Sequence, residues 1–190
     1  MSAIAFIFAR GGSKGLPSKN IKIFYGKPLI AWSILMAKKV DRIKRVIVST
    51  DSYEIAEVAK FYGAEVPFMR PENLSGDQSS EYLAWQHAIK HIKKTSDDGF
   101  TCMISLPTTA PLRELIDIEN CLDEYERGFA DVVITVTDAK RSPYFNMIKK
   151  NEATGNCEIV IKPSNNIARR QDVPVVYDMT TVAYVANTKF

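Results

Sequence analysis

The chain has 190 residues, of which 46% are hydrophobic and 25% are charged, and its formal net charge at pH 7 is +3. These values are typical of a globular protein that forms one domain, residues 1–190. The sequence contains no dense stripe of basic and aromatic residues, which argues against a nucleic-acid partner. Three scattered cysteines without a CxxC pair argue against a disulfide framework or a zinc knuckle. No apolar run reaches transmembrane length, so we expect a cytoplasmic protein without membrane contact.

Short apolar runs alternate with helical periodicity through most of the chain. Buried strands are predicted by the runs at 3–8, 45–50, 101–106 and 131–136, with a shorter strand at 65–69. Helices are predicted by apolar residues at helical spacing in 27–39, 51–63, 81–94 and 114–127. Asp51 or Ser52 is expected to cap the second helix. This alternation predicts a three-layer α/β fold, in which helices flank a mostly parallel sheet.

The alternation ends at residue 138. From 138 to 178 the sequence predicts no helix but a β-hairpin that turns at 154–156. The run at 180–186 predicts one more strand, which returns to the main sheet. We therefore predict a small β-rich lobe, residues 138–178, inserted within the single domain.

The segment ARGGSKGLPSKN, residues 9–20, follows the first predicted strand and contains three glycines, three cations and no acidic residue. Ligands of an open parallel sheet bind beyond the carboxyl ends of its strands. Glycines allow backbone N–H groups to approach phosphate oxygens, and Arg10, Lys14 and Lys19 can neutralise several negative charges. The spacing matches neither GxxxxGK[ST] nor GxGxxG. A glycine-rich turn with solvated lysines is the alternative, but the charge pattern favours a small polyanion.

Further polar loops, at 70–80 and 107–113, are expected at the same edge of the sheet. In the second of these loops, Arg113 is equally consistent with a structural ion pair and with a substrate contact. His87 and His91 have the spacing of metal ligands on a helix. With lysines around them and no third ligand nearby, a solvated helix face is the favoured interpretation.

The segment 9–20, followed by GKPLI, resembles the signature of cytidylyltransferases that activate acidic nine-carbon sugars, the CMP-sialic acid synthetase family. The segments VIVSTD, RPENLSGDQSS, PTTAPLR, SPYFNM and RRQDVP resemble later blocks of that family in the same order. The resemblance implies a Rossmann-like nucleotidyltransferase that transfers CMP from CTP to the anomeric hydroxyl of the sugar and releases pyrophosphate. Pseudaminate enzymes tend to have a second cation and an isoleucine where this chain has Gly15 and Leu16. The resemblance therefore favours sialic or legionaminic acid as the substrate.

The resemblance also implies roles for individual residues. Arg10 and Lys19 would be catalytic, Arg10 on the triphosphate and Lys19 near the α-phosphate. Thr108, Arg170 and Tyr184 would lie on the sugar side, with Arg170 facing the sugar carboxylate. The implied nucleotide-binding residues are Arg10, Gly11, Gly12, Ser13, Lys14, Lys19, Asn20, Arg70, Ser79 and Ser80.

Among these residues, Asn20 and Arg70 match family positions that read the cytosine edge. Pro107 and Thr180 stand where the family often has glutamine and asparagine, and these departures leave the exact sugar open. The alternatives are a cytidylyltransferase for KDO or pseudaminic acid, and a nucleotide-binding module whose catalysis is impaired. Family members pair through a lobe such as 138–178, so a homodimer is expected.

The resemblance further implies Mg²⁺, held by an acidic pair in a D-x-D stretch after the strand that corresponds to 180–186. This chain contains no D-x-D sequence, and we assign no residue to a metal. We therefore expect either that the printed sequence is part of a longer protein or that the protein lacks this metal site.

Overall fold

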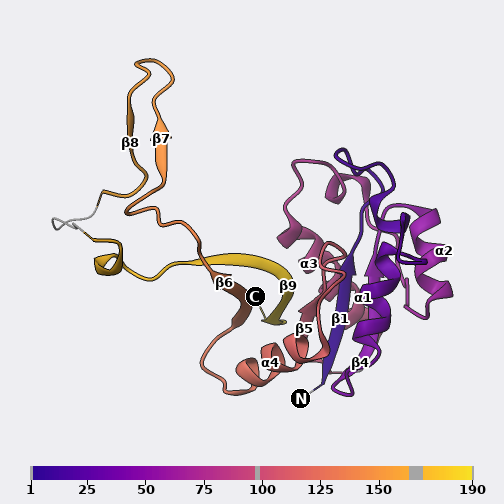
Figure 1. Ribbon diagram of the computed structural model, residues 1–190. Coiled ribbons are helices and arrows are strands. Elements are labelled where there is room, and N and C mark those ends of the chain that lie inside the picture. Colours follow the sequence, from indigo (N-terminus) through magenta and orange to yellow (C-terminus); the bar gives the residue numbers. More distant parts are fainter. Residues whose placement is uncertain (1, 97–98, 163–168, 190) are drawn as a thin grey trace. The chain divides into compact units, whose positions relative to one another are not determined.

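The computed structural model describes residues 2–96, 99–162 and 169–189 (Figure 1). The chain divides into two compact units. The larger one comprises Met1–Thr135 and Thr181–Phe190, and the smaller one comprises Val136–Thr180. The smaller unit corresponds closely in sequence to the lobe predicted at 138–178.

The larger unit is organised around one sheet with the strand order β4-β1-β5-β9-β6. Its strands are β1 (Ala3–Phe8), β4 (Ile43–Ser49), β5 (Cys102–Ser105), β6 (Val132–Asp138) and β9 (Tyr177–Asn187). The helices that accompany them are α1 (Leu29–Ala37), α2 (Tyr53–Phe61), α3 (Glu81–Thr95) and α4 (Leu115–Glu126). Strand β1 pairs in parallel with β4 and with β5, whereas β9 runs antiparallel to β5.

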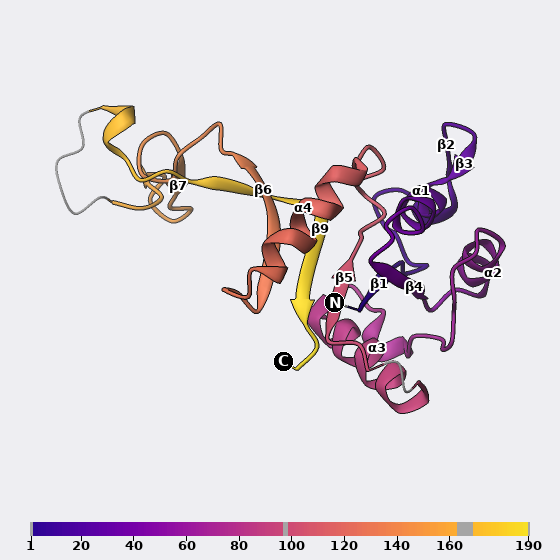
Figure 2. The same cartoon turned by 90° about the horizontal axis from the view of Figure 1, so that it is seen from below.

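Helices cover both faces of this sheet. On β1, Ala5 and Ile7 pack into a hydrophobic layer shared with α1, α2 and α4, and Phe6 packs into a second layer shared with α3. Figure 2 shows α3 on the opposite side of the strands from α1 and α4. The alternation of side chains along a strand explains how one buried run serves both layers. The predicted three-layer, mostly parallel α/β fold is confirmed.

Short elements connect these strands and helices. Two 3₁₀ turns, η1 (Lys19–Ile21) and η2 (Glu72–Leu74), lie in the segments after β1 and after α2. A small hairpin joins β2 (Ile23–Phe24) to β3 (Lys27–Pro28), and at its turn Tyr25 and Gly26 both have positive φ angles. None of the helices in the described residues is long and apolar enough to cross a membrane.

The strand predicted at 65–69 is not formed. This segment makes only two isolated bridges, Ile47 with Glu65 and Thr50 with Met69. Between them lies Pro67, which has no N–H group and cannot donate to a ladder. The prediction of a strand from apolar residues alone was therefore wrong at this position.

The smaller unit contains the predicted hairpin. Strands β7 (Ile148–Lys150) and β8 (Cys157–Ile159) pair antiparallel. The turn is closed by the Asn151 amide, which donates to the Asn156 carbonyl oxygen at 2.8 Å, and Gly155 has a φ of 73°. The left-handed conformation favours glycine at that position. A further 3₁₀ turn, η3, covers Arg170–Asp172.

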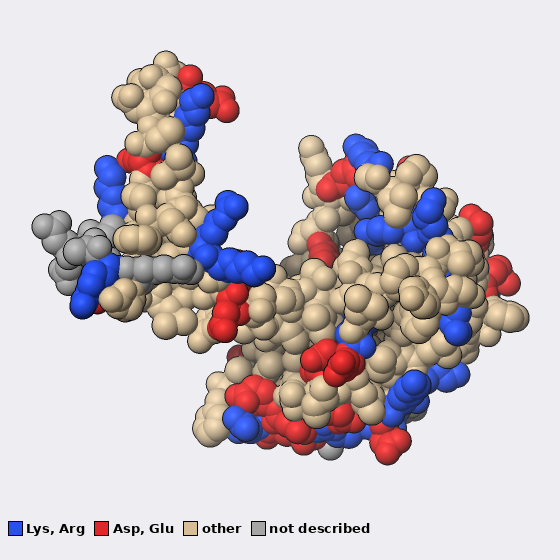
Figure 3. Space-filling view, in the orientation of Figure 1, with Lys and Arg blue, Asp and Glu red and all other residues tan. Residues whose placement is uncertain are grey.

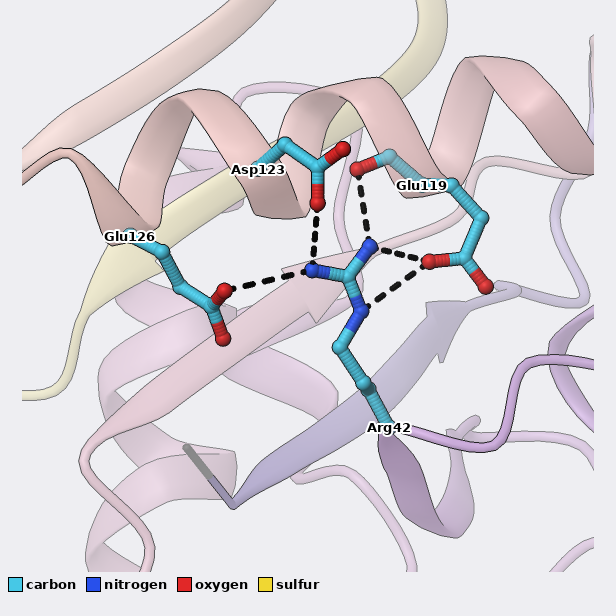
Figure 4. Close-up of polar contacts among 4 residues, drawn as sticks. All are labelled: Arg42, Glu119, Asp123 and Glu126. Carbon is cyan, nitrogen blue, oxygen red and sulfur yellow. Dashed lines mark hydrogen bonds and ion pairs between the residues drawn. The ribbon is translucent and has the colours of Figure 1, made fainter.

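Arg42, which precedes β4, holds α4 through several polar contacts (Figure 4). Its Nε donates to Glu119 Oε2 at 3.0 Å, and its Nη1 donates to Asp123 Oδ1 at 2.6 Å. Glu126 adds a longer contact of 3.4 Å to the same guanidinium. Because these carboxylates are partly exposed, water screens the interaction and its contribution to stability is modest.

Arg113 makes a different kind of contact, because its side chain is buried. Its Nε donates to the Val182 carbonyl oxygen at 2.9 Å, and its Nη1 donates to Ser33 Oγ at 2.7 Å. Its Nη2 donates to the Pro107 carbonyl oxygen. Burial lowers the pKa of the Arg113 guanidinium to about 10, so the group remains charged at neutral pH. Arg113 thus connects three parts of the fold: α1, the turn that follows β5, and strand β9. These contacts give it a structural role.

We expect Arg113→Met to lower the free energy of unfolding by about 3 kcal/mol, because it removes a buried guanidinium that donates to the carbonyl oxygens of Val182 and Pro107 and to Ser33 Oγ. Urea denaturation measures this loss. Arg127→Met is the matched control, because Arg127 makes an exposed ion pair with Glu124 at 2.8 Å. The control should change stability by less than about 0.5 kcal/mol. Equal effects of the two substitutions would contradict the structural role of Arg113.

Candidate functional site

A cleft of about 660 Å³ lies in the larger unit beside the carboxyl ends of β1 and β5. Its walls come from the segment after β1, the segment between η2 and α3, the start of α3, the turn after β5, and β9. The three polar loops predicted at this edge therefore meet around one cavity. The loops after β1 and β5 leave the same edge because these strands are parallel. Loop 70–80 reaches that edge because the segment before it makes parallel bridges to Ile47 and Thr50 of the β4 region.

Most of the predicted binding residues line this cleft. Gly11 and Gly12 do not line it, and Arg170 belongs to the smaller unit, where its side chain is outside the described part of the structure. The predicted residues that do line the cleft are Arg10, Ser13, Lys14, Lys19, Asn20, Arg70, Ser79, Ser80, Thr108 and Tyr184.

Gly11 anchors the segment after β1 instead of facing the cleft. Its amide donates to Asp51 Oδ1 at 2.9 Å. A Cβ atom at Gly11 would lie 3.1 Å from the Cβ of Ser52, a tight contact, so the close approach of the two segments favours glycine. Ser52 caps α2 by accepting a hydrogen bond from the Ile55 amide. Of the two predicted caps, Ser52 is the one formed, and Asp51 positions the loop.

Asn20 ties the end of the same segment to the turn after β5. Its Nδ2 donates to the Arg10 carbonyl oxygen at 2.9 Å, and its Oδ1 accepts from Thr108 Oγ1 at 2.7 Å. Both Asn20 and Thr108 are buried. Just before Asn20, Ser18 has a left-handed φ of 52°, an uncommon conformation for a serine, at the start of η1. Asn20 thus shapes the cleft through internal contacts, and its reading of cytosine stays a prediction.

Arg70 is held at the end of β4. Its Nε donates to Ser49 Oγ at 3.0 Å, and its Nη2 donates to the Ser49 carbonyl oxygen. The guanidinium carbon lies 5.7 Å from the centre of the Phe8 ring, a distance that permits a cation–π interaction. Burial lowers the pKa of Arg70. This cation is therefore fixed in position at one wall of the cleft.

Two other cations of the cleft, Arg10 and Lys14, meet a carboxylate that sequence reasoning missed. Arg10 Nη1 lies 2.9 Å from Asp77 Oδ1, and Lys14 Nζ forms an ion pair with Asp77 Oδ2. The hydrogen bond from Lys14 lowers the pKa of the Asp77 carboxyl, and the charge of Arg10 adds to this effect. Figure 3 shows basic side chains gathered over the segment after β1, whereas acidic ones gather over α4. The sequence did contain a signal for Asp77. It is an acidic residue in the loop 70–80, which was predicted at the same edge of the sheet as the basic segment 9–20.

The side of the cleft formed by β5, β9 and the turn between 107 and 109 is uncharged and rich in hydroxyl groups. Thr109 Oγ1 donates to Thr181 Oγ1 at 3.2 Å. Ser105 and Tyr184 also line this side, and burial raises the pKa of the Tyr184 phenol. Ser105 is a second lining residue that sequence reasoning missed, because nothing in a buried apolar run distinguishes a serine at its end.

The helix face at His87 and His91, predicted to be solvated, is half-buried. Both rings pack against Phe68, with centroid distances of 5.0 Å and 4.6 Å. Burial lowers the pKa of His87, which favours its neutral form. Within the described part of the chain, no group of three or more histidine, cysteine, aspartate or glutamate residues is arranged to hold a metal ion.

Comparison with known proteins adds independent findings. The family model described as cytidylyltransferase matches residues 4–189. A CMP-N,N'-diacetyllegionaminic acid synthase of Campylobacter jejuni is 35% identical over 179 residues, covering 94% of this chain and 74% of the relative. A pseudaminic acid cytidylyltransferase from the same species is 32% identical over 189 residues, covering 100% of this chain and 80% of the relative.

The fold also matches a solved structure. CMP:2-keto-3-deoxy-manno-octonic acid synthetase, complexed with CTP, superposes with a TM-score of 0.69 at 18% identity, covering 99% of this chain and 75% of the other. At this identity the match supports the nucleotidyltransferase fold alone. The sequence relatives support a more specific conclusion, because they match nearly the whole chain at more than 30% identity. The chain therefore belongs to the cytidylyltransferase family and, within it, to the CMP-nonulosonate synthetases.

Proposed function

We propose that this protein transfers CMP from CTP to the anomeric hydroxyl of an acidic nine-carbon sugar, with release of pyrophosphate. The observation that carries the proposal is the cleft in which Arg10, Lys14, Lys19 and Arg70 meet at the end of β1 and β4. Such a set of cations suits a triphosphate, because positive charges attract and neutralise its negative charge. Membership of the family supports the same reaction.

The cations have distinct proposed roles in an in-line attack on the α-phosphate. Arg10 and Lys14 stabilise the negative charge that builds up on the departing pyrophosphate, and Lys19 stabilises the charge at the α-phosphate. Catalysis of phosphoryl and nucleotidyl transfer rests mainly on positioning and on such electrostatic stabilisation. The rigid ties of Gly11 to Asp51 and of Asn20 to Thr108 support this role, because they hold the segment in place before the substrate arrives.

The base and the sugar are proposed to occupy opposite ends of the cleft. Arg70, Ser79 and Ser80 line the end that is proposed for cytosine, near Phe8. Thr108 and Tyr184 line the other end, which is proposed for the sugar. The carboxylate of the sugar requires a cation, and Arg170 remains the proposed partner from its position in the sequence.

A sialic or legionaminic type of acid is the proposed acceptor. The legionaminic relative and the pseudaminic relative have similar identity to this chain, so identity alone does not decide between them. Gly15 and Leu16 support the sialic or legionaminic type, because they replace the cation and isoleucine that are typical of pseudaminate enzymes. A substrate such as CTP, which is a cytoplasmic metabolite, is consistent with action in the cytoplasm.

Mg²⁺ is proposed to accompany the triphosphate, whose oxygens are usual ligands of this ion. The described residues supply no cluster of carboxylates that fits it. We therefore assign no step of the reaction to the metal and none of these residues to its coordination.

Asp77 is proposed to compete with the substrate for its cations. Its carboxylate contacts both Arg10 and Lys14, which are the groups proposed for the triphosphate. The lowered pKa keeps Asp77 ionised throughout the neutral range. CTP would have to displace this carboxylate in order to contact the same cations.

A homodimer that forms through residues 138–178 is proposed from the exposed apolar side chains of the smaller unit. Ile148 is 64% exposed and Ile161 is 42% exposed, although both belong to its hairpin region. Val175, Tyr177 and Met179 are also exposed. A second copy of the chain would remove such apolar surface from water.

The function is tested by incubating the purified protein with CTP, Mg²⁺ and one sugar at a time: N-acetylneuraminate, diacetyllegionaminate, pseudaminate or KDO. We expect pyrophosphate release with the first two sugars. Arg10→Ala and Lys19→Ala should each lower kcat/KM by roughly 10²- to 10³-fold. Lys22→Ala is the matched control, because Lys22 is exposed, lies in the same basic segment and does not line the cleft. CTP binding without turnover on any of the sugars would instead support an impaired nucleotide-binding module.

Asp77→Asn should lower the KM for CTP by roughly threefold, because the triphosphate no longer competes with an exposed carboxylate for Arg10 and Lys14. The difference from the unmodified protein should shrink as salt is added. Glu72→Gln removes an exposed charge from the same loop and serves as the control. A raised KM for CTP in Asp77→Asn would refute the competition.

The homodimer is tested by light scattering coupled to gel filtration. We expect a mass about twice the 21.3 kDa of the chain. The double variant Ile148→Asp, Ile161→Asp should elute as a monomer, because charges on the apolar surface oppose its burial. Ala153→Asp, in the exposed turn between β7 and β8, is the control for the added charge. A monomeric mass for the unmodified protein would exclude this dimer.

A further inference from the structure

Ser105, the last residue of β5, has a buried hydroxyl that makes no hydrogen bond within the described structure. The residue is only 1% exposed, yet it lines the cleft. Other buried hydroxyls have partners. Ser33 Oγ donates to the Pro107 carbonyl oxygen, Thr108 Oγ1 donates to Asn20, and Thr188 Oγ1 donates to the Phe100 carbonyl oxygen. Ser105 is therefore an exception among these buried hydroxyls, because buried polar groups in proteins normally have a hydrogen-bond partner.

The strand register places Ser105 next to the proposed sugar end of the cleft. Its pairing partners are Phe6 on β1 and Tyr184 on β9. Residues paired across neighbouring strands share one face of a sheet, so Ser105 and Tyr184 lie side by side on the face covered by α3. Trp85 of α3 lies on that face too, with its ring 6.2 Å from the ring of Tyr184.

The charge of the surroundings indicates which part of a substrate meets Ser105. The lining residues contributed by β5, by the turn after it and by β9 are all uncharged, and they are Ser105, Pro107, Thr108, Thr109, Thr181 and Tyr184. The basic lining residues come from other parts of the chain, namely the segment after β1 and Arg70, which bonds to Ser49 at the end of β4. The charged group nearest to this wall is acidic: Glu81 of α3 lines the cleft, accepts a hydrogen bond from Trp85 and contributes to the raised pKa of Tyr184. A wall of hydroxyl groups and aromatic rings beside a carboxylate suits the polyol part of a sugar rather than a phosphate.

We propose that Ser105 is a specificity-determining residue that hydrogen-bonds a hydroxyl group of the acceptor sugar. This inference rests on the proposed function, since it assigns Ser105 to the acceptor of that reaction. In the complex, Ser105 Oγ exchanges a hydrogen bond with the sugar beside Tyr184. The buried hydroxyl then gains the partner that the fold itself does not provide.

The proposed role of Ser105 can be tested, because Ser105→Ala should weaken binding of the acceptor without lowering the stability of the fold. A hydroxyl without a partner adds nothing to stability, so Ser105→Ala should unfold at the same temperature as the unmodified protein or at a higher one. A structural role would instead lower that temperature. The binding role requires that Ser105→Ala raise the KM for the acceptor by about tenfold or more, with the KM for CTP unchanged.

Ser33→Ala is the matched control, because it removes a buried hydroxyl that has internal partners at Pro107 and Arg113. It should lower the unfolding temperature and leave the KM for the acceptor unchanged. Ser105→Cys keeps a weak donor of similar size at the same position. It should retain part of the acceptor affinity that Ser105→Ala loses.

Binding of the acceptor alone separates this inference from the proposed reaction. Ligand-observed NMR with N-acetylneuraminate and with diacetyllegionaminate measures it for the unmodified protein and for Ser105→Ala. Weaker sugar binding by Ser105→Ala supports the inference even if no pyrophosphate is released, in which case only the proposed reaction fails. Equal binding by both proteins, or no sugar binding by the unmodified protein, overturns the role of Ser105. Normal turnover together with equal binding would leave the proposed reaction intact.

Discussion

The burial of β1 on both faces is the constraint on which the rest of the structure depends. Helices cover both faces of this strand, and β4 and β5 pair with it in parallel, one on each side. All three strands then end at the same edge, where their loops leave the sheet. The loop after β1 contains Arg10, Lys14 and Lys19. Arg70 reaches the same edge from the segment after α2, where it bonds to Ser49 at the end of β4. The packing of the core therefore places the charges of the site together.

Two internal ties turn this general geometry into a defined cleft. Asp51 holds the Gly11 amide next to the end of β4, and Asn20 connects the Arg10 carbonyl oxygen to Thr108 beyond β5. In each case a hydrogen bond from another part of the fold holds the segment after β1, so these internal bonds define the shape of the loop. Pre-organisation of this kind reduces the entropy that is lost when a substrate binds.

The arginines of the chain differ in function because their surroundings differ. Arg113 is buried and directs its donors to carbonyl oxygens and a hydroxyl, so it acts within the fold. Arg42 binds several carboxylates of α4 at the surface and acts between elements. Arg10 meets Asp77 within the cleft, where both groups keep partial access to solvent. An ion pair of that kind can be exchanged for another anion, which suits Arg10 to binding a charged ligand.

The sequence by itself determined the order of strands and helices, the position of the hairpin and the loops that carry the site, because periodicity and turn residues are local properties. It failed at 65–69, where the effect of Pro67 on pairing outweighed the apolar pattern. Only the tertiary structure decided which groups meet: Asp77 with Arg10, Arg113 with Ser33, and Ser105 with no partner. The two contacts join residues far apart in the chain, and the lack of a partner at Ser105 also depends on which side chains pack around it. Both follow from the packing of helices and strands, and a local sequence pattern does not encode that packing.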